Sequence, residues 1–212
     1  MSELDMRISK GPDNNGCYHF SQISIDNIPD IEEFIEDYAN KKIKEACENV
    51  LTRSMNSSNK YRYGEMGLLI SLCNDDVYKE FKGEYHKIVL SNTSYRKITS
   101  SRDLTDLVFV HNHPNNSTFS ANDIFVLART KSLCAIVAVG NRHNLFMLIK
   151  NTDETIPELE KDITNQAILI AKRDKFRYDK KVYMDIAAAH FLENNVKKYG
   201  LNYIKLKRRA FK

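Results

Sequence analysis

The sequence predicts an α/β fold, in which helices cover both faces of a mixed β-sheet and further helices follow at the C-terminus. Short apolar runs at residues 66–73, 107–110, 135–140 and 144–149 are typical of buried strands. The last two runs are joined by a short polar turn and predict a hairpin. Apolar residues at three- and four-residue steps over residues 30–55 indicate a long amphipathic helix before the strands. Strands mixed with helices in this way favour a layered α/β arrangement.

The first half of the chain also predicts where the long helix begins and where a second strand lies. The long helix should begin at a D-x-x-E cap formed by Asp30 and Glu33, directly after Pro29. Residues 84–91 show a mixed alternation of apolar and polar side chains, which predicts a second strand after the first apolar run. The polar residues from there to position 106 are expected to form a loop.

The length of 212 residues suits one main domain with extensions at both ends. We expect an N-terminal extension over residues 1–28, the α/β domain over residues 29–152, and a basic helical extension over residues 153–212 that packs on it. No run approaches the roughly 20 apolar residues of a membrane span, and the N-terminus lacks the apolar core of a signal peptide. The sequence therefore predicts a cytoplasmic protein without a membrane partner.

The last third of the chain concentrates the positive charge. From residue 161 onward there are 14 Lys and Arg against five Asp and Glu, whereas the whole chain carries a net charge of +4. Two helices are predicted there, at residues 157–174 and 181–199. A basic end follows, with Lys205, Lys207, Arg208, Arg209 and Lys212. That end predicts either a solvated surface, which is the commoner case, or a site that attracts nucleic acid or an acidic protein.

Two histidines stand at the end of the apolar run at residues 107–110. His111 and His113 are two positions apart, so on a strand both imidazoles face one side while Asn112 faces the other. Two histidines at the end of a buried strand are costly to bury without a partner. The spacing therefore predicts that His111 and His113 bind one metal ion.

A helical pattern begins at Ser120 and carries Asp123 in its first turn. As S-x-x-D, the pair is typical of a helix cap, in which the hydroxyl accepts a backbone N–H and the carboxylate lies at the positive end of the helix. A loop that turns back from His113 can equally set Asp123 beside the two histidines. His, His and Asp with a water as the fourth ligand form the open tetrahedral site of a catalytic zinc. The cap alone is the commoner role, and the two histidines favour the metal.

The tetrapeptide H-N-H-P at residues 111–114, followed by S-A-N-D at residues 120–123, resembles the JAMM motif of the JAB/MPN metallopeptidase superfamily. The H-N-H-P segment is similar to the RadC-like and phage-associated bacterial branch. The loop between His113 and Ser120 has six residues, one fewer than the family's motif. The resemblance implies a JAB/MPN-like, cytidine-deaminase-like fold, a Zn²⁺ cofactor and a catalytic glutamate upstream. Glu65, just before the first apolar run, lies in a segment similar to the one that carries this glutamate, with one residue fewer before the glycine.

Glu65 is the predicted general base. Glu80 and Glu84 are the alternatives, but Glu80 is expected in a polar turn and Glu84 is not followed by an apolar run. A carboxylate at the mouth of a metal site can take a proton from a bound water and return it to a leaving amine. Ser120 is the predicted donor of a hydrogen bond to the oxyanion that forms in the reaction.

These residues predict a zinc-dependent metalloprotease or isopeptidase that hydrolyses a peptide or isopeptide bond in a protein or peptide substrate. The substrate class follows from the resemblance. The alternative is a non-catalytic RadC-like JAB module that binds DNA or a protein partner through its basic C-terminal region. An HNH nuclease is not favoured, because that fold disperses its named residues along a ββα-metal unit, whereas here they fall within one strand end.

Overall fold

The computed structural model describes residues 13–15, 17–20, 25–34, 36–57, 62–73, 78–88, 93, 96, 99–100, 105–142 and 144–207. Its centre is a six-stranded sheet in the order β2-β1-β3-β4-β5-β6. The strands are β1 (Met66–Ser71), β2 (Tyr78–Lys82), β3 (Leu107–His113), β4 (Leu133–Gly140), β5 (Asn144–Lys150) and β6 (Leu201–Lys207). Strands β3 and β4 are parallel, and every other neighbouring pair is antiparallel.

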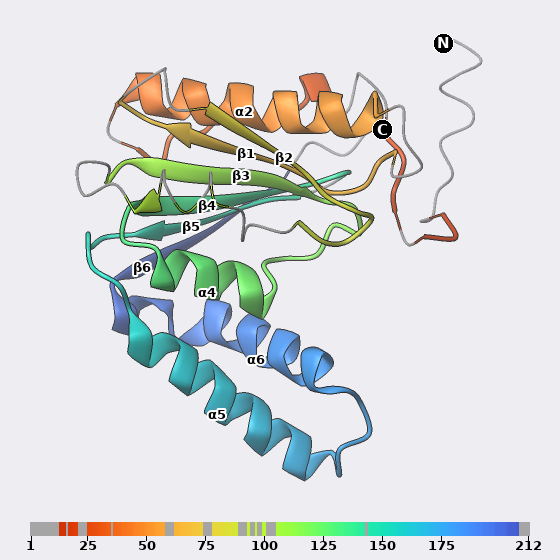
Figure 1. Ribbon diagram of the computed structural model, residues 1–212, viewed down its shortest axis with the longest axis vertical. Coiled ribbons are helices and arrows are strands. Elements are labelled where there is room, and N and C mark those ends of the chain that lie inside the picture. Colours follow the sequence, from red (N-terminus) through yellow and green to blue (C-terminus); the bar gives the residue numbers. More distant parts are fainter. Residues whose placement is uncertain are drawn as a thin grey trace.

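Helices cover both faces of this sheet, as predicted (Figure 1). Helix α2 (Asp37–Met55) lies on one face, and α4 (Ala121–Arg129), α5 (Pro157–Arg173) and α6 (Lys180–Asn194) lie on the other. The mixed α/β class is therefore confirmed. Within the described residues, none of the helices has the length and apolar character that a membrane crossing requires.

Each face of the sheet has its own apolar core, because side chains alternate between the faces along every strand. On β3, Val108 and Val110 belong to the core under α2, whereas Leu107 and Phe109 belong to the core under α4, α5 and α6. Part of the N-terminal segment joins the α2 core, since Phe20 is 2% exposed. The sheet is buried on both sides, so its central strands are held firmly in place.

The strands nearest the candidate site agree with the sequence prediction. Strands β1 and β3 form at the first two apolar runs, and β4 and β5 pair as the predicted antiparallel hairpin. Strand β3 continues through His113, so both histidines are part of the strand. Helix α4 begins directly after Ser120 and connects the parallel strands β3 and β4.

The start of the long helix differs from the prediction. Helix α2 begins at Asp37 and not at Asp30, and no side chain caps its first turn at Glu36. The side chain of Asn40 explains the later start, because it binds both the N–H and the C=O of Phe34, at 3.0 and 2.8 Å. These bonds hold residue 34 outside the helix.

The second strand also lies elsewhere. Strand β2 occupies Tyr78–Lys82 and pairs with β1 along its length. Residues 84–88, where the sequence predicted this strand, form a turn in which the Glu84 N–H donates to the Lys87 carbonyl at 2.9 Å. Residues 89–91 lie outside the described part of the chain. The charged side chains of β2 concealed a strand that lies at an edge of the sheet.

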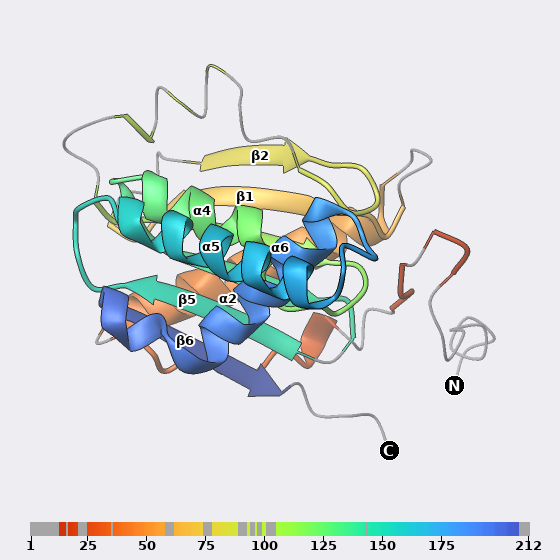
Figure 2. The same ribbon diagram turned by 90° about the horizontal axis from the view of Figure 1, so that it is seen from below.

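The C-terminal region contains the two predicted helices, α5 and α6, and one strand that was not predicted. After α6, a 3₁₀ helix, η2 (Val196–Tyr199), leads into β6, which pairs with β5 and forms the second edge of the sheet (Figure 2). Lys205 and Lys207 of the basic end lie on this edge strand. Arg208, Arg209 and Lys212 lie outside the described residues.

The α5–α6 hairpin is an insertion between two neighbouring strands. Lys150, at the end of β5, pairs with Leu201, at the start of β6. The Asn151 N–H donates to the Gly200 carbonyl at 3.0 Å, and Gly200 takes the left-handed conformation, with φ of 66°. The chain therefore leaves the sheet and returns to it at the same place.

Candidate metal centre

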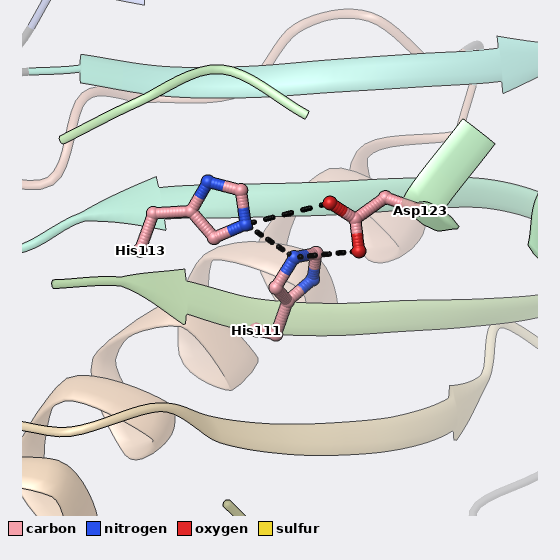
Figure 3. A group of neighbouring side chains, drawn as sticks. All are labelled: His111, His113 and Asp123. Carbon is pink, nitrogen blue, oxygen red and sulfur yellow. Dashed lines mark hydrogen bonds and ion pairs between the residues drawn. The ribbon is translucent and has the colours of Figure 1, made fainter. Parts of the chain in front are cut away.

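Strand β3 brings His111 and His113 together at its carboxyl end (Figure 3). The strand pairs with β1 and β4, so its backbone is fixed on both sides. The two Nε2 atoms lie 2.9 Å apart, and the residues are only 2% and 5% exposed. The ring of Phe109 stacks on that of His111, with centroids 5.1 Å apart, and limits its rotation. Two imidazoles are thus held with one nitrogen each at a common point.

Asp123 reaches the same point from the first turn of α4. Ser120 is the N-cap residue: its Oγ accepts the Asp123 N–H at 3.3 Å, while Asp123 Oδ2 accepts the Ser120 N–H at 2.8 Å. The same carboxylate places Oδ1 3.6 Å from His111 Nε2 and Oδ2 3.6 Å from His113 Nε2. The capping box is therefore complete, and it holds the carboxylate beside both histidines. The capping role does not compete with a metal-binding one.

A hydrogen bond fixes the tautomer of His113. Its Nδ1 lies 2.8 Å from the carbonyl oxygen of Ser117, which can only accept, so Nδ1 carries a proton. In the neutral ring this leaves a lone pair on Nε2, the atom that faces His111 and Asp123. Metal-binding histidines commonly donate their other ring N–H to a backbone carbonyl in this way. The Nδ1 of His111, by contrast, is buried and has no hydrogen-bond partner among the described residues.

The charges of the three side chains depend on one another. Burial lowers the pKa of His111, and the nearby Asp123 offsets this only in part. Burial also acts to lower the pKa of His113, but the Asp123 carboxylate outweighs it and raises that pKa. Burial acts to raise the pKa of Asp123, but the two imidazoles outweigh it and lower that pKa. Without a metal, the two imidazoles therefore hold a proton beside an ionised carboxylate, and a divalent cation would replace that proton.

A cavity of about 460 Å³ opens over this group. Glu65, which stands immediately before β1, lines the cavity. Burial raises the pKa of Glu65 to about 7, with His113 opposing the rise and Asp123 adding to it. The structure thus brings all five predicted site residues to one cavity: Glu65, His111, His113, Ser120 and Asp123.

Neither of the alternative glutamates lies among the residues that line this cavity. Glu80 is on strand β2, not in a turn, and forms an ion pair with Arg53. Glu84 contacts Glu65 through the backbone: its carbonyl accepts the Glu65 N–H at 2.8 Å. Of the three glutamates, Glu65 is the one placed to act on a group bound in the cavity.

The role of Asn112 was not predicted beyond its facing away from the histidines. Its side chain is fully buried on the α2 face of the sheet. Its Oδ1 accepts the Met66 N–H at 2.7 Å, and its Nδ2 donates to the Gly64 carbonyl at 3.1 Å and to Asn141 Oδ1 at 2.8 Å. Asn112 therefore fixes the end of β3 to the entrance of β1, where Glu65 stands. The sequence did contain a signal for this role: an asparagine that alternates with two histidines on a buried strand must bury its amide on the opposite face, where it needs hydrogen-bond partners.

Helix α6 contributes two residues to the cavity wall that were also not predicted, Lys181 and Asp185. Asp185 Oδ1 accepts the Ala121 N–H at 3.1 Å and so joins α6 to the start of α4. These residues are about 60 positions from Asp123 in the sequence, and no local pattern marks them. They bring the C-terminal hairpin to the rim of the site.

Comparison with known proteins does not identify a family for this chain. No protein-family model, curated protein or solved structure matches the chain. The chemistry of the site is therefore inferred from its own atoms.

The arrangement of His111, His113 and Asp123 fits a metal ion. One ligand atom from each lies within 4.8 Å of the other two. A tetrahedral zinc with nitrogen ligands at 2.0–2.1 Å sets neighbouring ligand atoms roughly 3.3–3.4 Å apart. The observed separations, 2.9 Å between the imidazoles and 3.6 Å to each carboxylate oxygen, lie on either side of that value. Each 3.6 Å distance ends at a different oxygen of Asp123, so one carboxylate oxygen would have to turn toward both nitrogens to complete the set.

Proposed function

We propose that this protein is a zinc-dependent hydrolase of peptide or isopeptide bonds, with a JAB/MPN-like fold and active site. One observation carries the proposal: two imidazoles and a carboxylate meet at the base of a cavity that also contains a partly buried glutamate, Glu65. The resemblance of residues 111–123 to the JAMM motif supports the choice of zinc and of the amide-type bond.

His111, His113 and Asp123 would hold the zinc, through Nε2, Nε2 and a carboxylate oxygen. Zinc bound by three protein ligands supplies Lewis-acid chemistry and lowers the pKa of a coordinated water to about 7. Neighbouring backbone groups orient two of these ligands. The Ser117 carbonyl fixes the ring of His113, and the Ser120 N–H fixes the Asp123 carboxylate.

Glu65 is the proposed general base. Its carboxylate takes a proton from the attacking water and later delivers it to the nitrogen of the leaving amine. In the metal-free protein the pKa of Glu65 is raised to about 7, and a bound cation would lower it and favour the ionised form that accepts the proton. Burial of the side chain in the cavity wall is the cause of the raised pKa.

Ser120 is the proposed donor to the oxyanion of the substrate. Its hydroxyl lines the cavity and donates to Asp123 Oδ2 at 2.7 Å. Rotation of the hydroxyl hydrogen from Asp123 to the substrate oxygen would complete the role. One such donor commonly contributes about 3 to 4 kcal/mol to the stabilisation of a transition state.

Metal content and turnover together test this function. We expect about one zinc per chain by mass spectrometry on protein purified without a histidine tag, and its loss in His113→Ala and Asp123→Ala. His190→Ala is the matched control, because His190 is exposed and bonds only to Gln166 and Asn194 among the described residues. Glu65→Gln should keep the zinc and lose the hydrolysis of peptide or isopeptide substrates. A chain without zinc after supplementation would exclude the proposal.

A further inference from the structure

The tip of the α5–α6 hairpin contains an apolar groove that the proposed chemistry does not use. Its volume is about 310 Å³, at the small end of ligand-binding pockets. The walls include Ile168 on α5, Tyr183 and Met184 on α6, and Phe176 and Tyr178 between the helices. Phe176 and Tyr178 are 66% and 60% exposed, so two aromatic rings stand open at the rim.

The backbone holds Phe176 at the rim in an unfavourable conformation. Helix α5 ends in a Schellman motif, in which the Lys175 N–H donates to the Lys172 carbonyl at 3.2 Å and the Phe176 N–H donates to the Ala171 carbonyl at 2.9 Å. Lys175 and Phe176 both have positive φ, 52° and 54°, in place of the usual glycine. A bulky residue rarely adopts this conformation, and such strain is found most often at functional sites. The end of α5 therefore holds the backbone of Phe176 at the mouth of the groove.

Cations are concentrated in the chain segment that contributes Phe176, Tyr178 and Lys180 to the groove. Six exposed basic residues lie between positions 172 and 181: Lys172, Arg173, Lys175, Arg177, Lys180 and Lys181. None of the six forms an ion pair with a residue in the described part of the chain. The two acids of this segment are engaged in the fold, Asp174 with the Tyr183 hydroxyl at 3.0 Å and Asp179 as the N-cap of α6. We call the groove and these six cations the tip surface.

The tip surface adjoins the candidate metal centre. Lys180 lines the groove, and the next residue, Lys181, lines the cavity that contains Glu65. The first turn of α6 therefore separates the two. Helix α6 lies below α4 in Figure 1. A helix is about 10–12 Å across with its side chains. An extended peptide rises about 3.3 Å per residue, so about three or four residues can span that distance.

We propose that the tip surface binds an acidic segment of the polypeptide substrate that carries one large apolar side chain. The apolar side chain occupies the groove against Phe176 and Tyr178, and carboxylates on either side of it contact the cations of the tip surface. The scissile bond then lies a few residues away, in the cavity. This inference rests on the proposed function for its link to hydrolysis, but the binding itself requires no metal.

Peptide binding to full-length protein with Glu65→Gln, which prevents turnover, tests the inference. The probe is a fluorescent peptide of about ten residues, rich in Asp and Glu, with one central Phe. We expect replacement of that Phe by Ala in the peptide, or Phe176→Ala in the protein, to weaken binding about tenfold. The double variant Lys175→Glu with Arg177→Glu should weaken it at least as much, and added salt should weaken it further.

Two matched controls separate the tip surface from general effects. Leu169→Ala removes an apolar side chain that is 65% exposed on the same hairpin but does not line the groove. Lys161→Glu with Lys197→Glu reverses two exposed charges outside the tip surface. Both should leave the affinity within about twofold, since neither removes a proposed contact. Equal losses in the controls and in the tip variants would overturn the proposal.

Other ligands give distinct results. Tighter binding of a single-stranded thymidine oligonucleotide than of the acidic peptide, dependent on Phe176, would overturn the proposal in favour of nucleic acid. Self-association that Phe176→Ala abolishes would overturn it in favour of a second copy of the chain. Zinc content is measured on the same samples. If the protein contains zinc but does not bind the peptide, only the tip-surface proposal is overturned. If it binds the peptide but contains no zinc, only the proposed hydrolase function is overturned.

Discussion

At the carboxyl end of β3, the two faces of the strand carry buried polar side chains that differ in how completely their hydrogen-bonding atoms are satisfied. On the α2 face, both polar atoms of the Asn112 side chain have partners that belong to the fold. On the other face, His111 and His113 direct their Nε2 atoms at each other, and the Nδ1 of His111 has no hydrogen-bond partner among the described residues. Full satisfaction is typical of a structural role, and incomplete satisfaction of buried polar atoms is typical of a ligand site.

The largest effect should come from the α2 face. Asn112→Ala leaves the Met66 N–H and Asn141 Oδ1 buried without this partner, while the Gly64 carbonyl keeps the hydrogen bond from the Ser54 hydroxyl at 2.7 Å. We expect the free energy of unfolding to fall by about 3 to 5 kcal/mol, because each unsatisfied buried group costs about 1 to 3 kcal/mol. Urea denaturation measures this, and Asn165→Ala, at an exposed asparagine on α5, serves as the control. A loss of stability below about 1 kcal/mol would contradict the structural role of Asn112.

The opposite face should respond to zinc. At a free zinc concentration 100 times the dissociation constant, we expect the unaltered protein to gain about 2.7 kcal/mol of stability, because the ion binds the folded state. His113→Ala should gain none, while His190→Ala should gain as much as the unaltered protein. Thermal unfolding with zinc and with a chelator measures the gain. An undiminished gain in His113→Ala would place the zinc elsewhere.

Ser120 tests whether the cap and the site are coupled. Ser120→Ala removes the N-cap hydroxyl, which should lower the free energy of unfolding by about 1 kcal/mol with a chelator present. It also removes a donor to Asp123, so zinc affinity should fall by roughly tenfold or more. Denaturation and zinc titration measure the two effects separately. Lower stability with unchanged zinc affinity would show that the cap does not orient the ligand.

The smallest effect should lie at the other end of β3, where Asp106 is a structural carboxylate. Partial burial raises the pKa of Asp106, but hydrogen bonds from the Ser71 hydroxyl and the Cys73 N–H outweigh it and lower that pKa. Its contribution to stability is therefore complete above the unfolded pKa of about 3.9 and is lost as pH falls through the lower folded value.

Asp106→Asn should cost less than about 1 kcal/mol at pH 7, because the group is partly exposed and solvent screens it. The difference from the unaltered protein should shrink below about pH 4, where both states become protonated. Denaturation at pH 7 and pH 3 measures it. A difference that does not change with pH would assign the effect to packing and not to charge.

The sequence was sufficient where a local pattern has one geometric meaning. Alternation along a strand placed His111 and His113 on one side, and S-x-x-D placed Asp123 in the first turn of α4. The cap and the metal ligand seemed to be alternatives because each was considered alone. The structure shows that one carboxylate meets both geometric requirements, with Oδ2 accepting from Ser120 and both oxygens near the histidines.

The sequence was insufficient where the environment decides. Strand β6 was missed because its lysines resemble a solvated tail, and only pairing with β5 makes it a strand. The later start of α2 depends on the Asn40 side chain, which binds Phe34 instead of facing solvent. Lys181 and Asp185 reach the cavity through the packing of α6 on α4, a contact between residues far apart in the sequence.

The position of the α5–α6 hairpin between β5 and β6 has a consequence for how such a protein can diverge. Because the chain leaves the sheet at Lys150 and re-enters opposite it at Leu201, changes confined to the tip need not shift the strands that carry the histidines. The outer end of the hairpin can therefore change in length and residue type without moving His111 and His113. The exception is the first turn of α6, where Lys181 lines the cavity and a change would reach both regions.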